Sequence, residues 1–138
     1  MNIKILLCLA FILCFTNIAI AEEIIIVNKT VTISSIDKET IQNIYLGRKN
    51  QWENGAKIYP VMLDGGQTHE NFVANVVKKT SDQFSAFWKK AIFTGQGKPP
   101  KAFASETELV AYVEQTDNAI GYINSSTPYK NVNVLTVK

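Results

Sequence analysis

Cysteine is absent from the chain after residue 14, and histidine and arginine occur once each, at His69 and Arg48. A domain without cysteine has no disulfide, no thiolate metal site and no cysteine nucleophile, so its stability depends on buried surface alone. His69 follows Asp64 and precedes Glu70. One histidine with two carboxylates is far more typical of a solvated helix start than of a metal site or a general base. We therefore expect no metal, no cofactor and no catalytic residue.

The first 21 residues have the pattern of a secretory signal peptide. Lys4 precedes an apolar run over residues 5–20, which is too short for a membrane span, and the run ends in the small-x-small sequence Ala19-Ile20-Ala21. Both cysteines of the chain lie in this run, without the small residues that precede a lipid-modified cysteine. We expect cleavage after Ala21 and export to the periplasm of a bacterial cell; the alternative is a retained anchor.

Residues 22–138 are expected to form one domain. Removing 21 of 138 residues leaves 117, which is enough for one hydrophobic core and too few for two. The whole chain carries 14 Lys and Arg residues against 12 Asp and Glu residues, a formal net charge of +2. This near balance indicates neither a nucleic acid nor a membrane surface as the partner.

The hydrophobic pattern predicts alternating strands and helices. A continuous apolar run at residues 24–27 is typical of a strand that is covered on both faces and lies in the middle of a sheet. Pro60 places the next predicted strand near a sheet edge, or makes it irregular. The predicted order is strand 24–27, helix 37–47, strand 58–63, helix 68–79, a helix after residues 80–81, a helix opened by a capping box at 105–108, and strands 119–123 and 132–137. We predict an α/β fold: one small layered domain with a central mixed sheet and helices packed on it.

The helix after residues 80–81 is expected to bury one apolar stripe, made of Phe84, Phe87, Trp88, Ala91 and Ile92. The glycine- and proline-rich loop 93–100 that follows lacks the full spacing of a nucleotide-binding glycine loop, and no strand leads into it. We therefore expect no nucleotide site there. Two lysines of this region, Lys98 and Lys101, either border an anion site or are simply solvated.

The most informative segment is a strand, a tight turn and a helix start at residues 58–79. The turn contains Asp64, Gly65, Gly66, Gln67 and Thr68. A helix N-terminus presents unpaired N–H groups and the positive end of the helix dipole, and two glycines allow close approach of a ligand to the backbone. These five residues are the predicted ligand-binding site for an anion. The alternative is an empty turn, with Thr68 as the helix cap and Asp64 in a structural role.

Five motifs in order resemble the phosphate-binding subunit of bacterial phosphate ABC transporters, and more closely the short single-domain members of that periplasmic-binding-protein-like superfamily. They are residues 37–47 ending in Ile44-Tyr45-Leu46-Gly47, Trp52, the turn at 64–68 with Phe72 after it, the loop 93–100, and Ala119-Ile120-Gly121-Tyr122-Ile123. The resemblance covers nearly all of residues 22–138. It implies the fold of one lobe of a type II periplasmic binding protein.

In that family, this lobe contributes an arginine, an aspartate and a Ser-Gly-Thr turn to the phosphate site. Aligned through Thr68, the aspartate is matched by Asp64, whereas the serine and arginine positions hold Gly66 and Met62. A thioether replaces neither the charge nor the two-pronged geometry of an arginine. The chain is also too short to include the opposite lobe. The resemblance thus implies weak or exposed binding of phosphate or a similar oxyanion, and two copies in a homodimer would rebuild a two-sided cleft.

Three classes of function follow. The favoured one is an exported solute-binding-like protein for phosphate or a related oxyanion, linked to ABC-type phosphate uptake or sensing. The alternative is a protein-interaction or sensory module that keeps the scaffold without the ligand and recognises a periplasmic or membrane transporter or receptor. An enzyme is poorly supported, because no nucleophile is paired with a plausible base.

Overall fold

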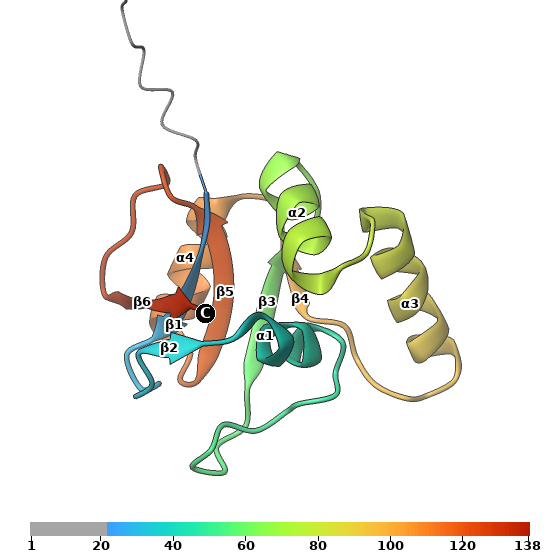
Figure 1. The fold of residues 1–138 in the computed structure, drawn as a ribbon, viewed down its shortest axis with the longest axis horizontal. Coiled ribbons are helices and arrows are strands. Elements are labelled where there is room, and N and C mark those ends of the chain that lie inside the picture. Colours follow the sequence, from blue (N-terminus) through green and yellow to red (C-terminus); the bar gives the residue numbers. More distant parts are fainter. Residues whose placement is uncertain (1–21) are drawn as a thin grey trace, which may run out of the picture.

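The computed structural model describes residues 22–138, whose strands form one six-stranded sheet (Figure 1). The predicted signal peptide, residues 1–21, lies outside the described residues. Along the sheet the order is β2-β6-β1-β5-β3-β4, with the bounds β1 Glu23–Asn28, β2 Ser35–Ile36, β3 Tyr59–Leu63, β4 Lys101–Phe103, β5 Ala119–Asn124 and β6 Val132–Val137. β1 is antiparallel to β5 and β6, whereas β3 is parallel to β4 and β5. The predicted α/β fold with a mixed central sheet is confirmed.

The position of β1 follows from its apolar sequence. Ile25, Ile26 and Val27 are at most 1% exposed, and β1 lies between β5 and β6. A run of branched apolar residues is stable in a strand only when both faces are covered, because every second side chain points to the opposite face. The predicted place of this strand in the middle of the sheet is therefore confirmed.

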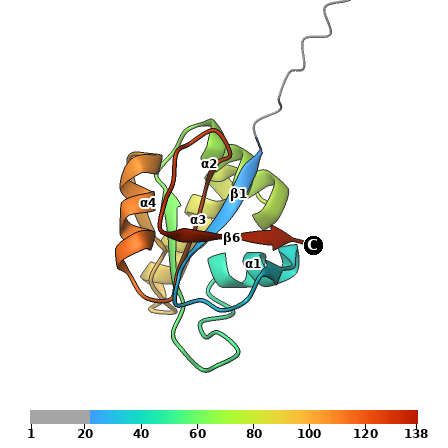
Figure 2. The same ribbon diagram turned by 90° about the vertical axis from the view of Figure 1, so that its left-hand side faces the viewer.

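Helices cover both faces of the sheet. Figure 2 shows α4 (Glu106–Gln115) on one side and α1 (Lys38–Tyr45) and α2 (Gln67–Phe72) on the other. On the α4 side, the helix approaches Gly121 of β5 so closely that a Cβ atom there would lie 2.7 Å from Cδ2 of Leu109. Among residues 22–138, no helix is long and apolar enough to cross a membrane.

The helix that follows the turn differs from the prediction in two ways. It begins at Gln67 and not at Thr68, and after Phe72 it continues as a π-helix, η1 (Val73–Val77). Lys78, with φ +63°, ends it in the left-handed region. Apolar residues at i and i+4 spacing suit an α-helix and a short π-helix alike, so the sequence pattern does not separate the two.

Two strands are not predicted by the sequence pattern. β2 has two residues and β4 has three, which is too short to display an alternation of period two. β4 forms the sheet edge beside β3, and Pro60 lies where β3 pairs with Ile120 of β5. The predicted position of the Pro60 strand near an edge is therefore confirmed.

The helix α3 (Ser81–Phe93) begins with a capping box between Thr80 and Gln83. Phe84, Trp88 and Ala91 are buried as predicted, but Ile92 is 55% exposed. The prediction for Ile92 is wrong because α3 lies at the outer side of the molecule (Figure 1) and buries only a narrow face. Helical periodicity indicates which residues share a face, but not how wide a face the neighbouring elements cover.

Candidate functional site

The predicted strand, turn and helix start are present at the end of β3. The backbone N–H of Asp64 donates to the carbonyl of Phe103 at 2.9 Å, which joins the turn to β4. Gly66 has φ +89°, a conformation that residues with a side chain rarely adopt, and its carbonyl accepts from the N–H of Glu70 at 3.0 Å. Glycine at position 66 thus allows the chain to turn directly from the strand into α2.

The N-terminus of α2 differs from those of the other α-helices. In α1, α3 and α4 the side chains of Asp37, Thr80 and Ser105 accept a backbone hydrogen bond and cap the helix. α2 begins after Gly66, and no side chain caps it. The alternative in which Thr68 caps the helix is wrong. The first N–H groups of α2 are consequently available to a ligand or to water.

The structure brings the five predicted site residues only partly together. Asp64 and Gly65 line a hollow of about 450 Å³ between the turn and α3. Gln67 instead donates through Nε2 to Oδ1 of Asn71 at 2.7 Å, along its own helix. Thr68 lies near α4, with its hydroxyl group 3.4 Å from Oε2 of Glu106. A ligand in the hollow would therefore contact Asp64 and Gly65, at the start of the turn, before it could reach Gln67 or Thr68.

The hollow carries an excess of negative charge. Asp64, Glu70 and Asp82 are among its lining residues, whereas Lys89 is its one cationic side chain. Met62, at the position where the family resemblance implies an arginine, also lines it. Within residues 22–138, no three His, Cys, Asp or Glu side chains are placed to hold a metal ion. Carboxylates accept hydrogen bonds and repel anions, so among oxyanions the hollow favours one that still carries a proton.

His69 is part of the core beneath the hollow, not a solvated residue as the sequence suggests. It is 6% exposed, and its Nδ1 lies 2.5 Å from the hydroxyl group of Tyr122. That hydroxyl also accepts from the N–H of Leu63 at 3.0 Å, so one tyrosine oxygen contacts both the imidazole and the end of β3. Which of the two groups donates in the contact with Nδ1 depends on the tautomer of His69. Burial lowers the pKa of His69, against the opposing effect of the Glu70 and Asp64 charges. His69 therefore has a structural role: it anchors the residues directly after the turn to β5 through Tyr122.

Glu106 joins the turn to the opposite side of the sheet. Its carboxylate accepts from the hydroxyl of Thr68, from the backbone N–H of Asn124 and, at 3.1 Å, from the hydroxyl of Thr127. Sequence reasoning places Glu106 in a capping box and does not reveal these contacts. The first turn of α4 does have its cap, since Ser105 accepts from the N–H of Glu108. Glu106 adds a further negative charge beside the predicted site.

This chain resembles known proteins in its fold, but not in its sequence. No protein-family model matches the chain, and no curated protein matches its sequence. An ABC-type phosphate transport receptor from Vibrio cholerae matches with a TM-score of 0.65 and 15% identity, over 85% of this chain and 46% of that protein. PstS from Borrelia burgdorferi matches with a TM-score of 0.66 and 18% identity, over 86% of this chain and 47% of PstS.

A third solved structure agrees with these two. A protein from Clostridium perfringens, named as a phosphate ABC transporter substrate-binding protein and solved with bound phosphate, has a TM-score of 0.66 and 18% identity, over 85% of this chain and 45% of that protein. In each case the chain covers less than half of its neighbour. Identities this low show the fold alone. This chain therefore has the fold of one lobe of the phosphate-binding proteins that serve ABC transporters.

Proposed function

We propose that the chain is an exported solute-binding-like protein that binds phosphate or a related oxyanion at residues 64–68, in ABC-type phosphate uptake or sensing. It is a binding protein and not an enzyme. The donors are the backbone N–H groups of Gly66, Gln67 and Thr68 together with the Thr68 hydroxyl, and Asp64 is the acceptor. Residues 22–138 form one lobe, so the contacts proposed here surround the phosphate on one side and leave its other side exposed.

One observation carries the proposal: α2 begins at a glycine without a side-chain cap, on a fold that the phosphate-binding proteins share. Exposed helix N–H groups and the helix dipole together attract an anion. The Thr68 hydroxyl has to leave Glu106 to contact that anion. The contact between them is long, at 3.4 Å, so the exchange costs little.

The carboxylates around the turn determine which anion is selected. Asp64, Glu70 and Asp82 repel both dianions, but hydrogen phosphate keeps a proton near neutral pH and donates it to Asp64, whereas sulfate has no proton to give. Arsenate carries the same protons as phosphate. The site is therefore proposed to prefer phosphate and arsenate to sulfate, with modest affinity because Met62 supplies no positive charge.

The test is isothermal titration of residues 22–138, purified free of phosphate, with phosphate and with sulfate. We expect saturable heat with phosphate only. Thr68→Ala should weaken phosphate binding by about 1–3 kcal/mol through loss of one donor. Thr127→Ala is the matched control, because it removes the other hydroxyl that contacts Glu106 and leaves α2 unchanged.

A gain-of-function variant extends this test. Met62→Arg places a guanidinium group in the hollow beside Asp64, at the position where the family resemblance implies an arginine. Affinity for phosphate should rise by about tenfold or more. Equal effects of Thr68→Ala and Thr127→Ala, or saturable sulfate binding, would contradict the proposed site.

The second candidate is a ligand-free protein-interaction or sensory module on the same scaffold. Two observations favour it. The Thr68 hydroxyl already donates a hydrogen bond to the Glu106 carboxylate, and Phe93 at the end of α3 is 92% exposed. An exposed phenylalanine is typical of contact surfaces. Absence of heat up to millimolar phosphate, for the parent chain and for Met62→Arg, would favour this candidate.

A further inference from the structure

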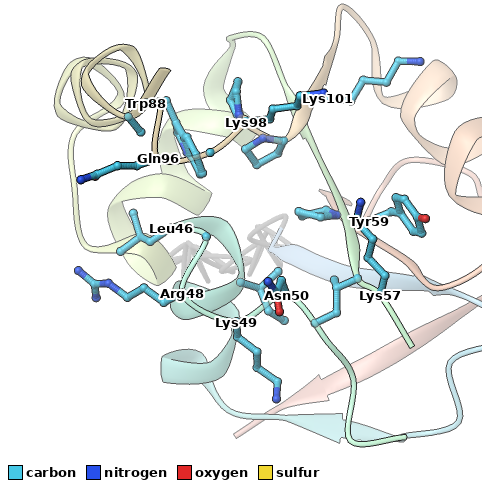
Figure 3. A pocket seen from close by; sticks show the side chains of 18 of the residues that line it. Leu46, Arg48, Lys49, Asn50, Lys57, Tyr59, Trp88, Gln96, Lys98 and Lys101 are labelled. Carbon is cyan, nitrogen blue, oxygen red and sulfur yellow. The ribbon is translucent and has the colours of Figure 1, made fainter. Parts of the chain in front are cut away.

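We propose that a second hollow, which we call the basic groove, binds an acidic peptide segment of a partner protein. The groove has a volume of about 680 Å³ and lies between the loop after α1, the start of β3 and the loop between α3 and β4 (Figure 3). This volume is within the range of about 300–1,000 Å³ that is usual for ligand sites. The groove includes none of residues 64–68, although it shares the lining residues Trp88 and Pro99 with the hollow beside the turn. Peptide binding in the groove is proposed to be independent of phosphate.

Positive charge surrounds the basic groove. Its lining includes the five cationic side chains of Arg48, Lys49, Lys57, Lys98 and Lys101, and none of its lining residues is acidic. The whole chain is almost neutral, so this concentration of charge is local. A surface with one sign of charge and low-dielectric walls attracts ligands of the opposite sign. The occupant should therefore be acidic.

Most of these cations are not neutralised within residues 22–138. Lys49 forms an ion pair with Glu53 at 3.3 Å, and Lys57 and Lys101 lie over the rings of Tyr59 and Tyr112 at 5.2 and 4.8 Å. Arg48 and Lys98 form no ion pair in the described part of the chain. Sequence reasoning leaves Lys98 and Lys101 as either the border of an anion site or solvated lysines. The groove favours the former.

The wall of the groove is apolar and fixed. Trp88, which is 7% exposed, donates through Nε1 to the carbonyl of Tyr45 at 3.2 Å. Its ring lies so close to Gly47 that a Cβ atom there would be 3.0 Å from the indole. Because Gly47 also has φ +72°, a residue with a side chain at this position would push the loop carrying Arg48 away from the tryptophan. The loop is held in place by backbone hydrogen bonds from Arg48 and Lys49 to the carbonyl of Asn43. The groove is consequently preformed.

The arrangement of the charges favours a peptide over a single oxyanion. In Figure 3, Arg48 and Lys49 lie on one side of the groove and Lys98 and Lys101 on the opposite side, and they do not converge on one point. A phosphate group is bound by donors that converge, whereas a chain with several carboxylates satisfies cations that are spread around a rim. The apolar wall suits leucine-like side chains between those carboxylates. A concave groove also accommodates a peptide better than it accommodates the flat surface of a lipid bilayer.

The experiment is fluorescence anisotropy of residues 22–138 with a fluorescein-labelled peptide that alternates glutamate and leucine. We expect saturable binding that weakens as salt is added, because salt screens exposed charges. The double variant Arg48→Glu/Lys98→Glu should weaken binding by at least about tenfold. The control Lys38→Glu/Lys130→Glu makes the same charge change outside the groove and should leave binding nearly unchanged. If the charge-reversed variant loses its circular dichroism spectrum, Arg48→Gln/Lys98→Gln replaces it.

Three results would overturn the proposal. The first is no peptide binding, and the second is an equal loss in the groove and control variants, which would indicate a general charge effect. The third is groove-dependent binding to vesicles of phosphatidylglycerol and phosphatidylcholine in place of the peptide, which would indicate a membrane surface. Failure of the proposed phosphate site at residues 64–68 can be distinguished from failure of the peptide site, because Thr68→Ala should change phosphate binding and leave peptide binding intact.

Discussion

The hydroxyl group of Tyr122 lies between Nδ1 of His69 and the backbone nitrogen of Leu63, at 2.5 and 3.0 Å. Its ring stacks on Phe72, with ring centroids 3.7 Å apart and planes 8° from parallel. One side chain of β5 thus contacts the end of β3 through a hydrogen bond and α2 through both a hydrogen bond and an aromatic stack. The turn at residues 64–68 joins these two elements, so Tyr122 contacts the chain on both sides of the turn.

Acidification should destabilise the domain through His69. The imidazole has a lowered pKa in the folded protein because burial disfavours its charged form, while the unfolded chain has the ordinary value of about 6.5. The unfolded chain therefore binds more protons as the pH falls through that value, and the free energy of unfolding decreases. Urea unfolding between about pH 7.5 and pH 5 should show a smaller decrease for His69→Gln than for the parent chain. Parallel pH profiles would contradict this role of His69.

Tyr122→Phe should lower the free energy of unfolding by about 1–3 kcal/mol, because it leaves the buried N–H of Leu63 without an acceptor. The stack on Phe72 is retained in this variant. Tyr129→Phe is the control, since Tyr129 is exposed and should change stability by less than about 0.5 kcal/mol. Urea denaturation of both variants measures the difference, and equal stabilities would show that the hydroxyl group is dispensable.

Gly121→Ala should destabilise the domain by overpacking. The added Cβ atom would lie 2.7 Å from Cδ2 of Leu109 and 3.0 Å from Cγ2 of Val61, so β5 and α4 would have to move apart. The expected cost is about 1–3 kcal/mol. Gly65→Ala, where no atom lies within 4 Å of the new Cβ, should be close to neutral. Thermal unfolding of the two variants would compare them directly, and a neutral Gly121→Ala would refute the close packing.

Glu106→Gln should raise phosphate affinity about three- to tenfold, because it removes a negative charge beside Thr68. Glutamine keeps an oxygen that can accept from the N–H of Asn124. Glu108→Gln is the matched control, since Glu108 is exposed in the same turn of α4 and its side chain is not among the contacts of Thr68. Isothermal titration distinguishes the two, and an unchanged affinity in Glu106→Gln would place the anion elsewhere.

Much of the fold could be predicted from local patterns. The apolar run of β1 indicates a covered central strand, and the caps at Asp37, Thr80 and Ser105 mark the starts of three helices that the structure contains. The turn at residues 64–68 is also local, because Gly66 permits a conformation that other residues rarely adopt. These features depend on neighbours in the chain and are therefore visible in the sequence.

The surroundings of the candidate site could not be predicted in this way. Glu106 contacts Thr68 of the turn from 38 residues away along the chain, and Tyr122 contacts His69, directly after the turn, from 53 residues away. No spacing rule in the sequence connects either residue to the turn. His69 has the sequence context of a solvated residue, yet it is buried because α2 packs its first turn onto β5. The exposure of Ile92 depends likewise on which elements reach α3.

The sequence by itself determined the order of the longer helices and strands, the central strand, the glycine turn and the absence of cysteine chemistry after residue 14, because each depends on short-range sterics or composition. Only the tertiary structure decided the sign of the charge that lines each of the two hollows. It gathered carboxylates beside the turn, and it brought Arg48 and Lys98 to one groove from segments that are distant in the chain. The charge of a surface depends on which segments fold together, and in this chain the packing of helices on the sheet determines that.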